Sequence, residues 1–236
     1  SMEPATTNPH FFIWVIFIGF TLLSWIISSQ LRSRFERYSK IPLPGGITGK
    51  DIAAKMLREN GITDVKIGSV SGRLTDHYNP IDKTINLSKE VYFGNSIAAA
   101  AVAAHETGHA VQHAKAYSML KLRSALVPAV SFASKYVQWI LLAGIIFIQT
   151  MPMLLPIGIG LFALTVLFCF ITLPVEIDAS KRALVWLRTS GISTAETQKK
   201  AFDALKWAAY TYIIAALSAL ATLLYYIMIF MGSRRN

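Results

Sequence analysis

The fold class is decided by an uncharged apolar stretch at residues 11–27, FFIWVIFIGFTLLSWII. A helix needs roughly 17–25 apolar residues to cross the hydrocarbon core of a bilayer, so this stretch is long enough to span a membrane. The alternative, a buried core helix, is disfavoured by that length. The basic residues that follow it are Arg32, Arg34, Arg37 and Lys40. Because basic residues stay on the cytoplasmic side, we expect a signal anchor with its N-terminus outside the cell.

The composition of the whole chain agrees with a membrane protein. Of the 236 residues, 53% are hydrophobic and only 15% are charged, which is too apolar for an ordinary soluble domain. A net charge of +10 would suit a nucleic-acid-binding protein, but the basic residues cluster beside apolar runs, which indicates membrane topology and no nucleic-acid partner. Cys169 is the only cysteine, so no intramolecular disulfide and no cysteine-based zinc site can form.

Three further apolar runs bring the expected number of transmembrane helices to about four. Pro174 is expected to end the third run. Counted from an outside N-terminus, the spans put both intervening polar segments on the inner side, although the basic residues at 234–235 would then lie outside. A three-span alternative makes one run a re-entrant or core helix. The expected order is a transmembrane helix at 10–29, a polar α+β segment at 31–126, two transmembrane helices within 127–173, a polar helical segment at 174–206, and a C-terminal transmembrane helix at 207–231.

Local signals divide the first polar segment. Thr48 is expected to cap a short helix that stops near Asn60, and residues 65–70 alternate in polarity as a strand does. Two further extended stretches flank a turn at 79–82. Asn95 or Ser96 is expected to cap the next helix, at 96–114.

This helix carries a His-Glu-x-x-His motif at residues 105–109. Residues four apart lie on one face of an α-helix, so His105 and His109 can bind one zinc ion. The carboxylate of Glu106 can then act as a general base toward a zinc-activated water molecule. The alternative is a chance match on a solvated helix face, which the alanine-rich, proline-free lead-in disfavours.

A catalytic zinc site has three protein ligands and one open position, so a third ligand is expected outside the motif. Glu176 and Asp178 follow directly on an apolar run, where carboxylates are unusual. We expect Glu176 to be this ligand, and Asp178 to be the alternative ligand or to hold an imidazole N–H. The competing explanations are a helix N-terminal role for Glu176 and an i,i+4 pair of Asp178 with Arg182.

Weaker candidates exist for the group that stabilises negative charge on a substrate carbonyl. They are Arg182, and His77 and Tyr78 on an extended segment that could pair with substrate as an edge strand. For His77 and Tyr78, a half-buried strand position without a catalytic role is the alternative. His113 continues the four-residue spacing, but it lies about 12 Å along the helix from His105, so we expect it at the surface or at an interface.

Four features together resemble the YugP family of membrane neutral zinc metallopeptidases. They are one apolar run before the motif with three after it, and the stretches 75–80, 104–113 and 174–183. The resemblance covers nearly the whole chain. It implies zinc as the cofactor, and it implies these functional residues: His105, His109 and Glu176 as ligands and Glu106 as base.

The chain is more distantly similar to HtpX-like membrane proteases. In those proteins an Asp four residues beyond the ligand Glu supports the site. Ser180 stands at that position here, which puts the supporting group in doubt and keeps Asp178 as a candidate.

The sequence therefore predicts a mainly α integral membrane protein with a small α+β cytosolic metallopeptidase domain. The predicted activity is zinc-dependent hydrolysis of membrane or unfolded proteins near the inner membrane surface, because Glu176 directly follows a span. The expected partners are the lipid bilayer and a membrane-associated peptide or protein substrate, with a homo-oligomer or a regulatory membrane partner left open. The predicted location is the plasma membrane, with a multi-pass topology and the active site facing the cytoplasm.

Two alternative functions remain. One is an intramembrane-type protease with zinc inside the bilayer. The other is a non-enzymatic membrane scaffold with a structural metal, whose site should be closed by four protein ligands.

Overall fold

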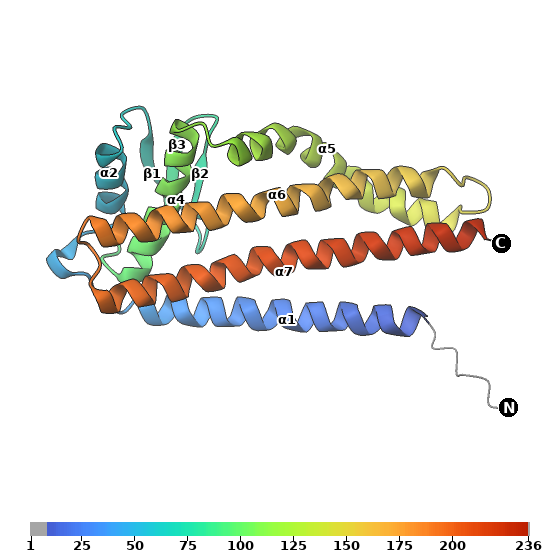
Figure 1. Cartoon of the computed structure of the whole chain (residues 1–236), viewed down its shortest axis with the longest axis horizontal. Helices are drawn as coiled ribbons and strands as arrows, with labels where there is room; N and C mark the ends of the chain where they lie inside the picture. Colours follow the sequence, from blue (N-terminus) through green and yellow to red (C-terminus); the bar gives the residue numbers. More distant parts are fainter. Residues whose placement is uncertain (1–8, 236) are drawn as a thin grey trace. The chain divides into compact units, whose positions relative to one another are not determined.

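The computed structural model describes residues 9–235, and most of them are helical (Figure 1). The chain divides into two compact units. Among the described residues, unit 1 comprises 9–28, 127–170 and 211–235, and unit 2 comprises 29–126 and 171–210. Each boundary falls inside a long helix, so the chain passes between the units without a loop.

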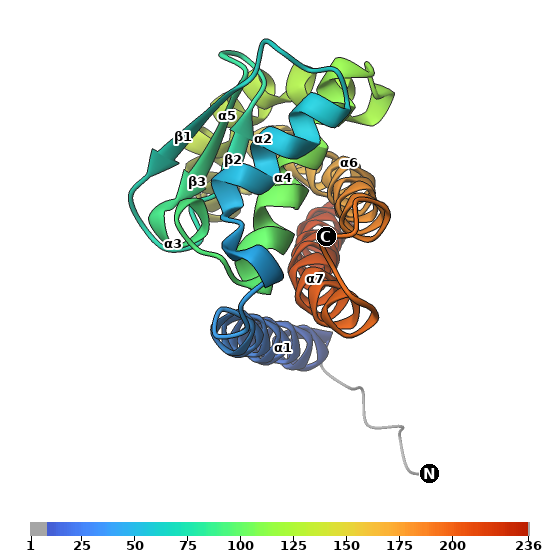
Figure 2. The same cartoon turned by 90° about the vertical axis from the view of Figure 1, so that its left-hand side faces the viewer.

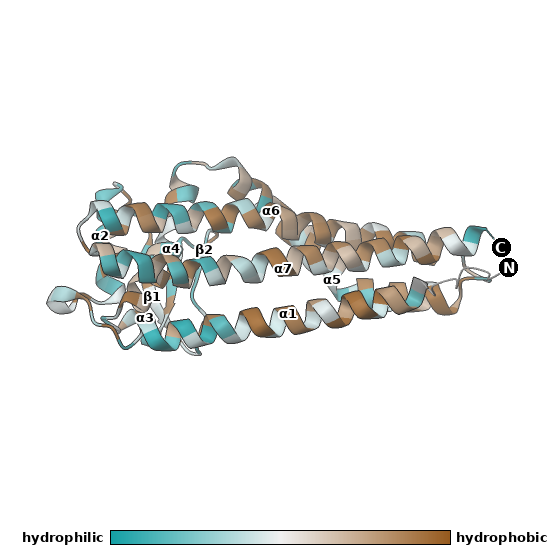
Figure 3. Ribbon diagram, turned by 60° about the horizontal axis from the view of Figure 1, so that its bottom comes forward, coloured by the Kyte–Doolittle hydropathy of each residue, from teal (hydrophilic) through white to brown (hydrophobic). Residues whose placement is uncertain are grey.

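Four helices within residues 9–235 are long and apolar enough to cross a membrane. Large apolar side chains such as Trp14 and Trp25 are about two-thirds exposed, as expected of a surface that faces lipid rather than water. Figure 3 shows hydrophobic residues along these helices within unit 1 and hydrophilic residues gathered on the elements of unit 2. The expectation of a mainly α protein with four candidate spans and a small sheet is confirmed. The four helices are α1 (Pro9–Tyr38), α5 (Ser118–Ile146), α6 (Leu154–Thr189) and α7 (Ala195–Arg234).

The interior of unit 1 is built from apolar side chains of α5 and α6. Val137 and Leu141 of α5 pack with Leu155, Phe162 and Val166 of α6, and partly buried residues of α7 join this cluster. The cluster contains no charged group, so it can form inside a bilayer.

Unit 2 contains the other elements, among them a three-stranded sheet of order β1-β3-β2. β1 and β3 are parallel, and β2 pairs antiparallel with β3, with Tyr78 opposite Ile85. Helices α2 and α4 pack against each other and both contact the sheet (Figure 2). The remaining elements are η1 (Pro44–Gly46), α2 (Gly49–Glu59), β1 (Lys66–Val70), β2 (His77–Asn79), β3 (Thr84–Ser88), α3 (Lys89–Tyr92) and α4 (Ile97–Ala114).

The predicted caps in unit 2 are confirmed. Thr48 forms a capping box with Asp51, and α2 ends at the Asn60 cap. Ser96 caps α4 by accepting the backbone N–H of Ala99 at 3.1 Å. Helix α4 is the centre of the unit 2 core, and its alanine-rich first half is buried almost completely.

The prediction that Pro174 ends the third apolar run is wrong. Helix α6 continues through this residue to Thr189. A proline inside a helix removes one N–H donor, but membrane helices tolerate this loss when neighbouring groups satisfy the freed carbonyl. As a result, the residue 174 region enters unit 2 as a continuous helix, which gives Glu176 a rigid position.

Candidate metal centre

Helix α4 presents both histidines of the motif on one face. Their rings are perpendicular, with centroids 4.9 Å apart. His109 is buried and His105 is nearly so. The buried first half of the helix and its Ser96 cap fix the helix axis, so the two imidazoles have a defined direction.

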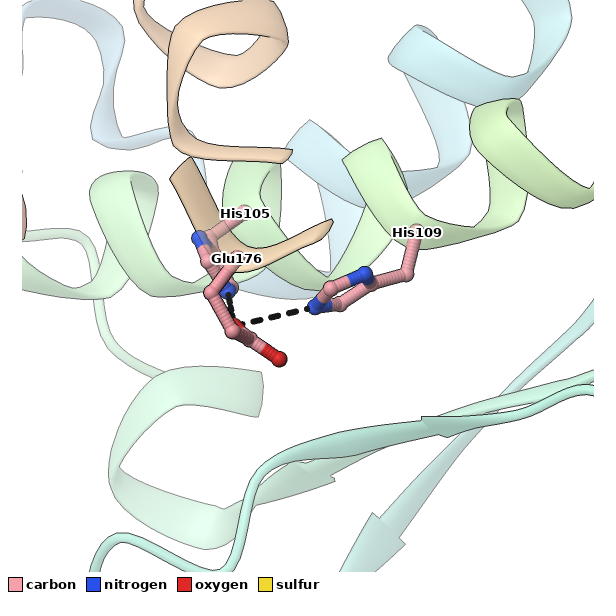
Figure 4. A group of neighbouring side chains, drawn as sticks. All are labelled: His105, His109 and Glu176. Carbon is pink, nitrogen blue, oxygen red and sulfur yellow. Dashed lines mark hydrogen bonds and ion pairs between the residues drawn. The ribbon is translucent and has the colours of Figure 1, made fainter. Parts of the chain in front are cut away.

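Glu176 reaches the two imidazoles from α6 (Figure 4). Its Oε2 atom lies 2.8 Å from Nε2 of His105 and 3.3 Å from Nε2 of His109. One donor atom from each of the three side chains lies within 4.8 Å of the others. Glu176 is at least 67 positions away from both histidines in the sequence, and the packing of α6 against α4 brings it to them.

Gly108 makes this packing close. A Cβ atom at Gly108 would lie 2.7 Å from the backbone oxygen of Ala179 in α6. Only a glycine permits this approach between the two helices within unit 2.

The other nitrogen of each imidazole has its own partner. Nδ1 of His105 lies 2.8 Å from Oγ of Ser180, and Nδ1 of His109 lies 2.9 Å from Oε1 of Gln112. An amide oxygen only accepts, so Nδ1 of His109 carries the proton and its Nε2 is left with a lone pair. Through its contact with Nδ1, the hydroxyl of Ser180 can orient the ring of His105.

These residues fit a zinc ion. Two imidazole nitrogens and one carboxylate oxygen form a ligand set that catalytic zinc sites use. Hydrogen bonds at Nδ1 that fix the ring and its tautomer are the usual support of such ligands. Both Nε2 atoms face the carboxylate of Glu176, as shared coordination of one ion would need.

Asp178, the alternative ligand, does not belong to the group of three side chains that could hold a metal ion. Among the described residues, that group contains Glu176 and the two histidines. Its Oδ2 accepts hydrogen bonds from Nε2 of Gln112 at 2.8 Å and from Nε of Arg182 at 2.6 Å. The expected i,i+4 pair with Arg182 therefore forms. Through Gln112, Asp178 also supports His109 indirectly.

Sequence reasoning missed Arg123 and Gln112. Nη1 of Arg123, on α5, donates to Oε1 of Glu176 at 2.8 Å. Gln112 donates to the backbone oxygen of Val175 as well as to Asp178, which ties α4 to α6. The available signals were weak: Arg123 precedes an apolar run, and Gln112 lies three residues after His109 on the same helix face.

Glu106 follows the first ligand and lies in surroundings that disfavour its charge. Burial raises its pKa to about 8, opposed by the nearby His105. The like charges of Glu176 and Asp76 raise it further. Surroundings that raise the pKa of this carboxyl favour its uptake of a proton, as a general base requires.

The candidates for charge stabilisation lie in different places. The hydroxyl of Tyr78 faces α4 and lies 2.7 Å from Nδ1 of His113, and burial raises its pKa to about 12. His113 is thus half-buried where α4 meets β2, which agrees with the interface alternative. His77, which precedes Tyr78 on β2, is exposed, and its Nδ1 atom lies 2.8 Å from the backbone oxygen of Thr75. Arg182 is engaged by Asp178.

Comparisons with known proteins agree with this geometry. A family model described as "Putative neutral zinc metallopeptidase" matches residues 13–231. The chain is 40% identical over 224 residues to the "Putative membrane protease YugP" of Bacillus subtilis, covering 93% of this chain and 99% of that protein. No solved structure matches the chain. Since the family match spans nearly the whole chain, the protein belongs to the neutral zinc metallopeptidase family of membrane proteins to which the sequence resemblance pointed.

Proposed function

We propose that the protein is a membrane-bound zinc endopeptidase that cleaves membrane-associated or unfolded protein segments. The observation that carries this proposal is the group formed by His105, His109 and Glu176, beside Glu106. Both imidazoles offer Nε2 toward the carboxylate, because Ser180 and Gln112 hold their Nδ1 atoms.

In this proposal His105, His109 and Glu176 hold the metal. When bound, zinc supplies Lewis acidity that polarises a carbonyl and makes water more acidic. Glu106 takes a proton from the attacking water and delivers it to the amine that leaves. Arg123 keeps Glu176 oriented by occupying its second oxygen.

Tyr78 is the favoured donor to the carbonyl oxygen of the substrate. Its raised pKa keeps the hydroxyl protonated at physiological pH, and His113 fixes its position from α4. His77 and Arg182 remain the alternatives for this role. Support for Tyr78 over Arg182 comes from the carboxylate of Asp178, which already neutralises Arg182.

The substrate strand is proposed to lie along β2. This strand is at the edge of the sheet, and it contacts α4. An edge strand can bind an extended peptide through backbone hydrogen bonds without regard to sequence. Because Glu176 lies on a candidate membrane-spanning helix, the scissile bond would be held near the inner membrane surface of the plasma membrane.

The alternatives have less support. A structural zinc site is closed by four protein ligands, whereas the described residues bring three metal-binding side chains together. An intramembrane protease would need its base inside the apolar helices. Glu106 instead lies on α4, which is not among the candidate spans of residues 9–235.

The test compares Glu106→Gln with the wild type, both purified in detergent and in lipid nanodiscs. We expect the variant to retain zinc at wild-type stoichiometry and to lose at least about 100-fold in peptide hydrolysis, the size of a general-base contribution. Glu196→Gln, at an exposed position of α7, is the matched control and should remain fully active. Unchanged hydrolysis by Glu106→Gln would rule out the proposed mechanism.

A further inference from the structure

A cavity of about 300 Å³ lies in unit 2 beside the first half of α4. Its buried wall consists of Val91 of α3 and of Ala98, Ala99 and Val102 of α4, together with the two small polar residues Ser88 and Ser96. Phe35, from the end of α1, lines another side. The cavity is therefore floored by small and aliphatic side chains, and it is large enough to take a bulky one.

Five charged residues line this cavity, namely Arg32 and Glu36 of α1 together with Arg73, Asp76 and Glu90. Arg73 and Glu90 form an exposed ion pair with atoms 3.4 Å apart. Asp76 accepts the backbone N–H of Ser88 at 2.7 Å. Leu74 lies exposed at the same rim, with a positive φ of 58°. Since four of the five charged residues are exposed and the buried wall is mostly apolar, an apolar side chain is the occupant that loses least on entry.

Two relations connect the cavity to the proposed catalytic site. Val102 is four residues before Glu106, so the two lie on one face of α4 a single turn apart. Asp76 lines the cavity and directly precedes β2, the edge strand proposed to bind substrate.

We propose that this cavity is the specificity pocket of the enzyme and that it receives a bulky apolar side chain next to the scissile bond. The inference rests on the proposed function. A peptide extended along β2 reaches the pocket at Asp76, where the strand begins.

The test fills the pocket with Ala98→Leu. Hydrolysis is measured on two peptides that differ only in having Phe or Ala at the position next to the cleaved bond. We expect the wild type to prefer Phe and the variant to lose at least about tenfold in the Phe-to-Ala ratio of kcat/KM, as a pocket changed by a few methylene groups does. Ala114→Leu, at an exposed position of the same helix, should keep the wild-type ratio.

A second arm does not depend on turnover. In the Glu106→Gln background, binding of the fluorescently labelled Phe peptide should weaken about tenfold with Ala98→Leu and stay unchanged with Ala114→Leu. If Ala98→Leu fails to fold, Leu74→Ala at the exposed rim replaces it and should weaken the same peptide. Equal Phe-to-Ala ratios in the wild type, or ratios and binding unaffected by both pocket variants, overturn the pocket. Peptide binding that depends on the pocket without any hydrolysis by the wild type would instead overturn the proposed function alone.

Discussion

The carboxylate of Glu176 has a different partner on each oxygen. Oε2 faces the two imidazoles, and Oε1 accepts a hydrogen bond from Arg123. This division leaves one oxygen for a metal ion and fixes its direction. It also compensates the charge of a nearly buried carboxylate before a metal binds, which would otherwise be costly.

Replacing Arg123 with Ala should therefore weaken zinc binding. Loss of a supporting partner typically costs about 10–100-fold in metal affinity, and we expect a value in that range. Competition with a zinc chelator measures it. Arg188→Ala, an exposed residue at the end of α6, is the control and should leave affinity unchanged. Wild-type zinc affinity in Arg123→Ala would mean that Glu176 is oriented by α6 alone.

The two carboxylates of α6 should respond differently to neutralisation. Glu176→Gln removes a proposed ligand, so we expect zinc to be lost at stoichiometric concentrations. Asp178→Asn removes the charge that accepts from Gln112 and Arg182 but no proposed ligand, so zinc should remain bound with at most about tenfold weaker affinity. Metal analysis after gel filtration separates the outcomes. Zinc loss in Asp178→Asn together with retention in Glu176→Gln would exchange the two roles.

At the scale of elements, the site depends on how closely α6 approaches α4. A Cβ at Gly108 would meet the backbone of α6 at 2.7 Å, and a backbone atom cannot move aside as a flexible side chain can. The separation of these two helices sets the distance between Glu176 and both histidines. One methyl group at this position should thus affect stability and metal binding together.

We expect Gly108→Ala to destabilise unit 2 by about 1–3 kcal/mol, the usual cost of overpacking, and to weaken zinc binding. Thermal unfolding in detergent, with and without zinc, measures both effects. Gly160→Ala is the control, because a Cβ there has no neighbour within 4 Å. If Gly108→Ala unfolds at the wild-type temperature, the close approach is not needed for the helix packing.

Sequence signals predicted the elements that local chemistry determines. The caps Thr48 and Ser96 act within three residues, and the helical spacing of the motif is local too. The end of α6 was mispredicted because whether Pro174 breaks a helix depends on its surroundings. Arg123 and Gln112 were missed because their roles arise only when α5, α4 and α6 pack together.

At the scale of the whole molecule, unit 2 constrains the membrane topology. Its two stretches, 29–126 and 171–210, form one compact body, so they must lie on the same side of a membrane. Residues 127–170, which connect these two stretches, contain most of α5 and the first part of α6. These two helices therefore both cross or both do not, and their length and apolar surface favour crossing. The remaining issue is which side unit 2 faces.

Single cysteines can settle this orientation, because Cys169 is the only natural one and can first be replaced by Ser. Ile81→Cys reports on unit 2, where this side chain is 92% exposed, and Met153→Cys reports on the turn between α5 and α6. With unit 2 cytoplasmic, an impermeant maleimide should label Met153→Cys in intact cells and Ile81→Cys only after permeabilisation. The reverse pattern would put the proposed active site outside. Labelling of both in intact cells would mean that α5 and α6 do not cross, and the bilayer would then have no part in bringing Glu176 to α4.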